Sequence, residues 1–552
     1  CENGFLGDDE FLDISNPNQT TVNEFWRSRA DAQAAVIATY SALQSPNVMG
    51  GQGMMYRACL SGDEGYPRAF NEADVRDQLY TFNYNSNTAF VNNLWKEVYT
   101  GVFRANQVIK NVPNITGLEE EDMTTFVAEA KFLRGLFYFW LMNFYNEGNI
   151  PLVTEVATSP DDIYTELSDK SVVLAQILED LEAAQAGLPR TWNEVNKGRA
   201  TWGAATALLG KVHLYEENWV EAAAYFKQVI NSGLYTLVES PFDNFNIAGE
   251  HNSESIFEVG FSAEAKPGAN VTQTFLFDTP SGSEGTYRAR LFNIGGSMAG
   301  WHSFILGGFL GEALILDTLD TSNPMNEGRT YSLRSEASIG FQFDGLPFYT
   351  VTAEDGRHNN STSGLVAKKY QNWTLPQEDI VTNASSINER LIRLADVYLM
   401  YAEAIVERDG AVSQEAVDYL NLVRDRAGVA RKIGPSDDPD NPSFASKESF
   451  INYLVWLERP RELCIEGFGI RFLDLRRKGK FAESVARLSD SPGTYKQPSW
   501  KSVNDATGLN PVPREYGFKS MSARRFNAYN PGEVFHHWLP LPSEELLANL
   551  LL

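Results

Sequence analysis

Two stretches of the sequence carry the mixture of aromatic and polar side chains that can bind a sugar. The first, Gly62–Asn71, contains Tyr66 and Arg68, and the second, Tyr287–His302, holds Trp301 next to glycines that would leave its ring accessible. A flat aromatic face packs on the C–H face of a pyranose ring, while polar neighbours bond to the hydroxyls. Packing in the core is the alternative role for each of these side chains.

A cluster of charged residues near the C-terminus could be mistaken for a catalytic or phosphate-binding site. Glu458, Glu462 and Glu466 recur every four residues and therefore line one face of a helix. The arginines that could pair with them are Arg461, Arg471, Arg476 and Arg477. We interpret this cluster as a structural ion-pair network.

Motifs for catalysis or metal binding are weak. Gly295–Ala299 lacks the final glycine of a nucleophile elbow, and neither HExxH nor CxxC is present. With 72 acidic residues, some pair will have glycosidase spacing by chance, so a secreted glycoside hydrolase stays an alternative. We expect no cofactor, although the acidic loop Asp437–Asn441 leaves a structural calcium open.

Composition limits the class of protein. The 552 residues are 43% hydrophobic, which is enough for a large core, and the net charge of −26 makes nucleic acid an unlikely partner. No apolar run reaches the roughly 18 residues of a membrane-spanning helix. Cys59 and Cys464 are interpreted as isolated buried thiols rather than a disulfide.

The clearest structural pattern is a helical hairpin. Apolar residues recur at helical spacing in Arg199–Tyr215 and again from Trp219 to Ile230, and Gly233 follows where a left-handed helix terminus belongs. Small residues at the expected contact points, including Gly210, match the tetratricopeptide pattern in part.

The same offsets predict a second hairpin, and further helices precede the first. The predicted helices are Ala30–Leu43, Ala89–Asn111, Glu119–Tyr145, Ser168–Ala186, Asn388–Arg408, Ser413–Gly428 and Ser446–Gly467. Such pairs must stack into a superhelix to bury their apolar faces. Residues 236–386 are instead irregular, with short strand-like pieces such as Ser255–Phe261, and a segment of that length is usually functional.

The first residue, Cys1, suggests a cleaved bacterial lipoprotein whose thiol carries lipid. Stable anchoring needs more than one acyl chain, which a lipoprotein cysteine would supply. An arbitrary boundary of the sequence is the alternative.

Several segments, in order along the whole chain, resemble the SusD/RagB family of nutrient-binding lipoproteins from the outer membrane of Bacteroidetes. They are Glu129–Phe139, Asn149–Val153, Gly198–Tyr235, Ile392–Ala404, Glu458–Gly467, Arg471–Arg477 and His537–Pro542. The resemblance implies a mainly α fold, a tetratricopeptide-like superhelix of about four helix pairs with a large irregular loop and short-strand region inserted. It divides the chain into residues 1–235 and 236–552, with the variable ligand-binding segment at 236–386, in what we expect to be one body.

The resemblance also implies a function. A member of this family would bind oligo- or polysaccharide without catalysis, carry lipid on Cys1, and deliver the glycan to a SusC-like TonB-dependent transporter. Because the ligand face would be assembled from the two aromatic stretches, the expected ligand-binding residues are Tyr66, Arg68, Tyr287, Trp301 and His302. A peptide-binding member of the family is an alternative.

The same resemblance gives the location, which is the outer membrane with the protein facing the exterior. The acidic net charge disfavours anionic glycans, although local basic residues could offset it. Those residues are Arg57, Arg68, Arg288 and Arg290.

Overall fold

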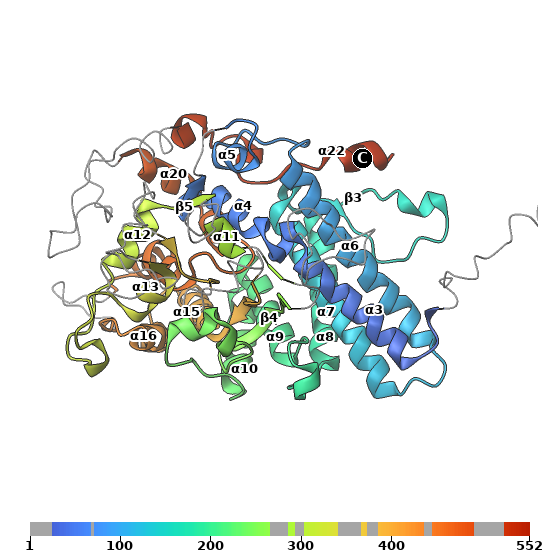
Figure 1. Ribbon diagram of the computed structural model, residues 1–552, viewed down its shortest axis with the longest axis horizontal. Helices are drawn as coiled ribbons and strands as arrows, with labels where there is room; N and C mark the ends of the chain where they lie inside the picture. Colours follow the sequence, from blue (N-terminus) through green and yellow to red (C-terminus); the bar gives the residue numbers. More distant parts are fainter. Residues whose placement is uncertain are drawn as a thin grey trace, which may run out of the picture.

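Paired α-helices build most of the described chain, so the predicted mainly α fold class is confirmed (Figure 1). The computed structural model describes residues 25–67, 71–264, 285–286, 288–292, 303–340, 366–371, 385–434, 444–490 and 524–551. Its strands are short and form antiparallel pairs.

The N-terminal helices lie side by side, as Figure 1 shows. They are α3 (Arg29–Ser41), α6 (Ala89–Asn111), α7 (Glu120–Phe144) and α8 (Lys170–Gly187). The Ser28 hydroxyl accepts from the Asp31 amide and caps α3. Helix α7 is surrounded by α3, α6 and α8, which explains why nearly every residue of its second half is buried.

The two predicted hairpins are present. Helices α9 (Trp202–Tyr215) and α10 (Trp219–Asn231) form the first, and α15 (Leu394–Asp409) and α16 (Gln414–Arg426) form the second. A Cβ added at Gly210 would lie 2.6 Å from Phe226, so the glycine permits the close contact of α9 with α10. Because α10 also packs on α15, the hairpins stack into one superhelix.

The predicted start of the second hairpin was wrong. Residues Glu389–Arg393 form strand β8, which pairs with β4 (Ser255–Val259), and the helix begins only at Leu394. Each charged side chain of this buried strand has a buried partner, including Glu258 for Arg390 and Glu254 for Arg393. A charged strand of this kind can be mistaken for part of a helix, because its polar residues hide the alternating pattern.

The predicted helix Ser446–Gly467 is interrupted. It consists of α17 (Lys447–Tyr453), a π-helical turn at Leu454–Glu458 and α18 (Arg459–Leu463). Pro460 has no N–H to bond to the carbonyl four residues earlier, and a wide turn before a proline accommodates this loss.

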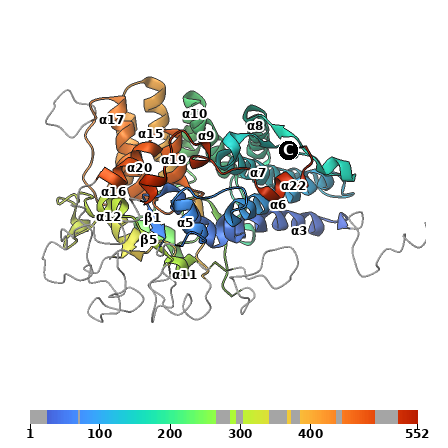
Figure 2. The same ribbon diagram turned by 90° about the horizontal axis from the view of Figure 1, so that it is seen from above.

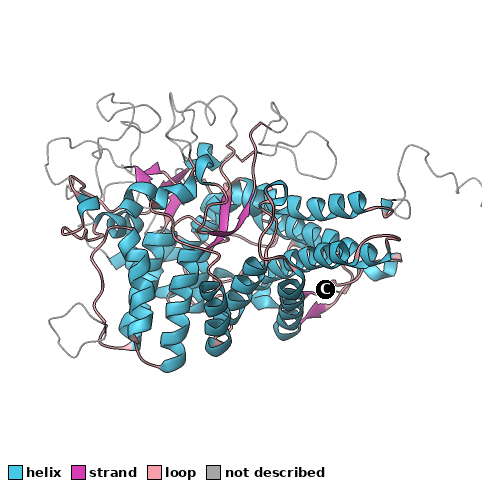
Figure 3. Cartoon of the chain, turned by 90° about the horizontal axis from the view of Figure 1, so that it is seen from below, coloured by secondary structure: helices cyan, strands magenta, loops and turns pink. Residues whose placement is uncertain are grey.

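The remaining elements are short. They are α4 (Gln52–Ser61), α5 (Val75–Tyr80), α11 (Arg288–Phe292), α12 (Gly308–Ile315), α13 (Leu333–Ser338), α19 (Ile470–Arg477), α20 (Phe481–Asp490), α22 (Ser543–Ala548), β1 (Gly65–Pro67), β2 (Ile150–Pro151), β3 (Leu167–Ser168), β5 (Phe304–Leu306), β6 (Ile339–Gly340) and β7 (Val366–Ala367). Strands β1 and β5 and helix α11 lie at one edge of the molecule, and α9, α10 and α15 lie at the other (Figure 2). Figure 3 shows that helices make up most of the described chain and that its strands are few and short.

A network of buried charges lies in the C-terminal half. Glu458 pairs with Arg334 at 2.5 Å and Arg424 at 2.7 Å, and Glu462 pairs with Arg393 at 2.7 Å and with Arg426. Glu466 joins Arg393 at 2.6 Å and Lys369 at 2.5 Å. The cluster is therefore structural, as expected, but the predicted partners were wrong.

The arginines of the same segment bind elsewhere. Arg461 donates to the Ala313 carbonyl, Arg471 pairs with Asp63 at 2.5 Å, and Arg477 pairs with Glu403. Arg476 stacks on Trp538. They tie the last helices to several other parts of the fold.

Cys59 and Cys464 are both buried and free, which confirms that they form no disulfide with each other. Burial raises the pKa of the Cys464 thiol, so it stays protonated and inert. No helix in the described ranges combines the length and apolar character needed to cross a bilayer.

Candidate functional site

The structure brings the first aromatic stretch together with the strand that follows the second one. Strand β1 pairs antiparallel with β5, with Gly65 opposite Leu306, Tyr66 opposite Ile305 and Pro67 opposite Phe304. Residues more than 200 positions apart in sequence thus become neighbours at one edge of the helical body (Figure 2).

The end of helix α4 fixes where β1 starts. Gly62 ends the helix in the left-handed conformation, with φ of 76°. The Arg525 guanidinium donates to the carbonyls of Leu60 at 2.6 Å and Ser61 at 3.3 Å, which the helix leaves without intrahelical partners. A Cβ at position 62 would lie 2.2 Å from the Arg525 Nε atom. Only glycine allows both the turn and the arginine cap.

Two neighbouring acids then hold the strand in different ways. Asp63 forms a buried ion pair with Arg471 and accepts from the Ser484 hydroxyl at 3.1 Å. Glu64 accepts from the Ile465 amide at 2.8 Å, and its own carbonyl accepts from Gly307 at 2.7 Å. Burial, reinforced by the charge of Asp63, raises the pKa of Glu64 to about 7.

The far side of the junction is fixed by two arginines. Arg76 pairs with Asp74 and donates to the Ser303 carbonyl at 3.4 Å, which connects the start of α5 to the residue before β5. Arg288, the first residue of α11, pairs with the buried Glu389 and donates to the Ile387 carbonyl at 3.0 Å. The β1–β5 junction is therefore a rigid base held by charges from several elements.

Of the predicted ligand-binding residues, only Tyr66 lies in the part of the chain that the structure describes. Tyr66 lies in β1 with only 5% of its surface exposed, and burial raises the pKa of its hydroxyl. A ligand would reach its ring only if neighbouring groups moved. Arg68, Tyr287, Trp301 and His302 lie outside the described residues, as does Cys1.

Two of the basic residues expected to offset the acidic charge are not available to a ligand. Arg57 is buried, donates to the Val48 carbonyl at 2.8 Å and lies 4.0 Å above the Phe468 ring. Arg288 is buried in its pair with Glu389. Their predicted role in attracting anionic glycans was therefore wrong.

Metal chemistry finds no support in the part of the chain that is described. No group of three His, Cys, Asp or Glu side chains within it is placed to hold an ion. The acidic loop Asp437–Asn441 lies outside that part.

The sequence did not reveal the residues that frame this junction. Asp63 pairs with Arg471, Arg76 reaches the Ser303 carbonyl and Arg525 caps α4, and no local spacing marks these long-range contacts. The one available signal was Gly62, because a glycine after a helical segment commonly marks a left-handed cap.

Comparison with known sequence families defines the class of protein. A family model described as the SusD family matches residues 323–552, and one described as starch-binding associating with outer membrane matches residues 10–214. The chain belongs to the SusD/RagB family.

Individual relatives agree with this assignment. A SusD-like protein of Formosa agariphila is 24% identical over 470 residues, which cover 81% of this chain and 84% of the relative. A SusD-like protein of Bacteroides ovatus is 26% identical over 372 residues, covering 64% and 62% of the two chains.

Solved structures share the fold. A SusD superfamily protein from Bacteroides vulgatus superposes with a TM-score of 0.74 at 24% identity, covering 96% of this chain and 98% of that one. Surface glycan-binding protein A from Bacteroides thetaiotaomicron, solved in complex with laminarihexaose, has a TM-score of 0.68 at 21% identity over 95% and 98% of the chains. A laminarin-binding SusD-like protein has a TM-score of 0.68 at 24% identity over 95% and 98%.

Proposed function

We propose that the protein binds an oligo- or polysaccharide at the cell surface without cleaving it. The observation that carries this proposal is the β1–β5 junction, which joins the first aromatic-rich stretch to the strand that follows the second, on a rigid base in a member of the SusD/RagB family. Laminarin-binding and laminarihexaose-bound relatives of the same fold support a carbohydrate ligand.

The residues that we expect to contact the glycan are Arg68, Tyr287, Trp301 and His302. Indole and phenol rings pack on sugar C–H faces, while arginine and histidine donate to hydroxyl groups. Tyr66, being buried, would support this face from below. The rigid base lowers the cost of binding because fewer groups lose freedom when the ligand arrives.

We also propose a cellular location and a partner for the protein. Lipid on Cys1 would hold the protein on the outer membrane, and the family description of association with that membrane supports this location. A SusC-like TonB-dependent transporter would receive the glycan. The helical hairpins supply a rigid frame by which the protein would dock on it.

Calorimetry and affinity electrophoresis against a panel of neutral polysaccharides test the binding function. Trp301→Ala should weaken binding at least about tenfold, on the order of 1.4 kcal/mol, with the unfolding temperature unchanged. Trp219→Phe is the control, since Trp219 packs on the scaffold in α10 at the opposite edge. Failure of a folded sample to bind any glycan would reject the proposal. A lowered unfolding temperature for Trp301→Ala would indicate that Trp301 packs in the core instead of binding the ligand.

A glycoside hydrolase would show itself by turnover. Reducing ends should not accumulate when the protein is incubated with a polysaccharide that it binds. Their accumulation would show that the protein cleaves the polysaccharide and would contradict the proposal. Binding of a peptide panel with no binding of glycans would favour the peptide-binding alternative.

A further inference from the structure

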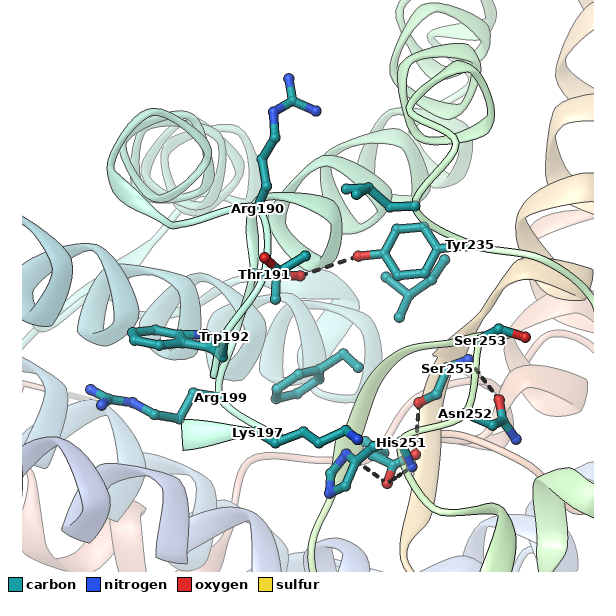
Figure 4. Close-up of a pocket in the computed structure, with 16 residues that line it drawn as sticks. Arg190, Thr191, Trp192, Lys197, Arg199, Tyr235, His251, Asn252, Ser253 and Ser255 are labelled. Carbon is teal, nitrogen blue, oxygen red and sulfur yellow. Dashed lines mark hydrogen bonds and ion pairs between the residues drawn. The ribbon is translucent and has the colours of Figure 1, made fainter. Parts of the chain in front are cut away.

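A separate pocket lies in the scaffold, between the loop that connects α8 to α9 and the segment that leads into β4 (Figure 4). Its volume is about 270 Å³, slightly below the roughly 300 to 1,000 Å³ of pockets for drug-sized ligands. A pocket of this size suits one sugar ring rather than a long chain. None of its lining residues belongs to the β1–β5 junction.

Aromatic side chains that are already fixed form its walls. Trp192 is half-buried and donates from its indole nitrogen to the Ala200 carbonyl at 2.8 Å. Tyr235, on the facing side in Figure 4, has its hydroxyl 3.3 Å from that of Thr201. Phe257 of β4 closes the pocket with a core side chain. The Arg199 guanidinium lies 4.5 Å from the centroid of the Trp192 ring, so a sugar ring could pack only on the other face of the indole.

Polar groups form the floor. The Nδ1 atom of His251 lies 3.0 Å from the Glu258 carboxylate, and the Ser255 hydroxyl donates to the same carboxylate at 2.7 Å. A Cβ added at Gly198 would lie 2.9 Å from the His251 ring, so this glycine lets the loop approach the imidazole. Lys197 extends toward His251 in Figure 4.

The balance of charge in this pocket is opposite to that of the whole chain. Glu258 is the one carboxylate among the described residues that line it, and Arg390, at 3.3 Å, already neutralises it from the protein side. Arg199 is likewise paired, with Glu129. Lys197 has an exposed contact at 3.4 Å with Glu194, and Arg190 lies at the rim over the Trp202 ring at 4.2 Å. Lys197 and Arg190 thus give the pocket an excess of positive charge on a protein of net charge −26.

We propose that this pocket is a second saccharide site, one that binds a single sugar unit carrying an acidic group, either a carboxylate or a sulfate ester. The ring would lie between Trp192 and Tyr235, and its anionic group would meet Lys197. The His251 ring lines the pocket and would contact its hydroxyls. The site extends the proposed glycan-binding function and assumes a saccharide ligand, but it does not depend on the β1–β5 junction.

Isothermal calorimetry with three probes tests the site. They are tetragalacturonate, the same oligosaccharide with its carboxyl groups reduced to alcohols, and a sulfated galactan tetrasaccharide. We expect at least one anionic probe to bind, binding to weaken as salt rises, and the reduced probe to bind at least about tenfold more weakly. The anionic probe that binds more tightly identifies the acidic group.

Substitutions of lining residues test whether the anionic probe binds in this pocket. Lys197→Gln should weaken it about three- to fivefold, the range expected for a partly exposed ion pair, and Lys197→Glu should weaken it further. Thr191→Trp, at an exposed lining position, should block the pocket without changing its charge. Lys110→Gln is the matched control, because Lys110 is exposed on α6 with only a 3.5 Å contact to a carbonyl.

Three results would overturn the proposal: no binding of either anionic probe, equal binding of the reduced probe, or equal binding by wild type, Lys197→Glu and Thr191→Trp. Unchanged unfolding temperatures for the variants exclude misfolding as the cause. Failure here is distinguishable from failure of the proposed function, because neutral glycans should respond to Trp301→Ala and not to Thr191→Trp.

Discussion

Replacing Glu64 with glutamine should stabilise the protein at pH 8 and leave it nearly unchanged at pH 5. Burial raises the pKa of this carboxyl from 4.5 to about 7, and the nearby charge of Asp63 adds to the rise. Below pH 4.5 the group is neutral in both the folded and the unfolded chain. Above about pH 7 it is ionised in both, and the folded protein bears the cost of a buried charge.

The size of the effect follows from the two pKa values. Stability contributed by the neutral group is present below the unfolded pKa and is lost as the pH rises through the folded pKa. At about 1.4 kcal/mol for each pH unit, the rise from 4.5 to about 7 corresponds to at most about 3.5 kcal/mol. Glutamine cannot ionise, and it keeps an oxygen for the Ile465 amide.

Urea unfolding of both proteins at pH 5 and pH 8, followed by tryptophan fluorescence, measures this difference. Asp63→Asn is the adjacent control with the opposite sign, because breaking its buried pair with Arg471 should cost about 3 to 5 kcal/mol at both pH values. The reasoning is refuted if Glu64→Gln gains no stability over wild type between pH 5 and pH 8.

Three further substitutions test the scaffold. Gly62→Ala should cost about 3 kcal/mol in thermal unfolding, since it combines a left-handed alanine with displacement of the Arg525 cap. Gly210→Val should cost about 1 to 3 kcal/mol, because its Cβ would lie 2.6 Å from Phe226 and separate α9 from α10; calorimetry measures the loss. Burial opposes ionisation of Glu462, but the surrounding guanidinium groups hold the pKa of its carboxyl near 2. Glu462→Gln should therefore destabilise the protein above pH 4.5, and the loss of stability should shrink as the pH falls toward 2. Acid unfolding of both proteins measures this difference.

Each of these has a control or a contradicting outcome. Gly117→Ala shares a left-handed φ of 80° but would contact nothing within 4 Å, so it should cost only about 1 to 2 kcal/mol. An equal loss for Gly62→Ala would contradict the role of Arg525. An unchanged unfolding temperature for Gly210→Val would deny the close helix contact, and a deficit independent of pH would argue against the ionised state of Glu462.

The helical hairpins could be predicted because their signals are local. Helical spacing from Arg199 to Ile230 and the glycine that follows are read within one stretch of chain, and α9 and α10 formed where expected. Strand β8 could not be recognised in this way. Its charged residues are compatible with a buried strand only because partners such as Glu258 come from other elements.

The candidate site shows the same limit. That Glu458, Glu462 and Glu466 form a structural network followed from their spacing, but their partners Arg334 and Arg393 are far away in sequence. The pocket around Trp192 was missed altogether, because three separate segments contribute to it and no motif joins them.

The buried charges of the C-terminal half also make its folding depend on a complete chain. Arg334, Arg393 and Arg426 are made before the glutamates of α18 and its preceding turn, and they would have to enter a dry interior without enough counter-charge if the chain stopped early. A copy of the chain that ends before these glutamates should therefore fail to close this half of the fold.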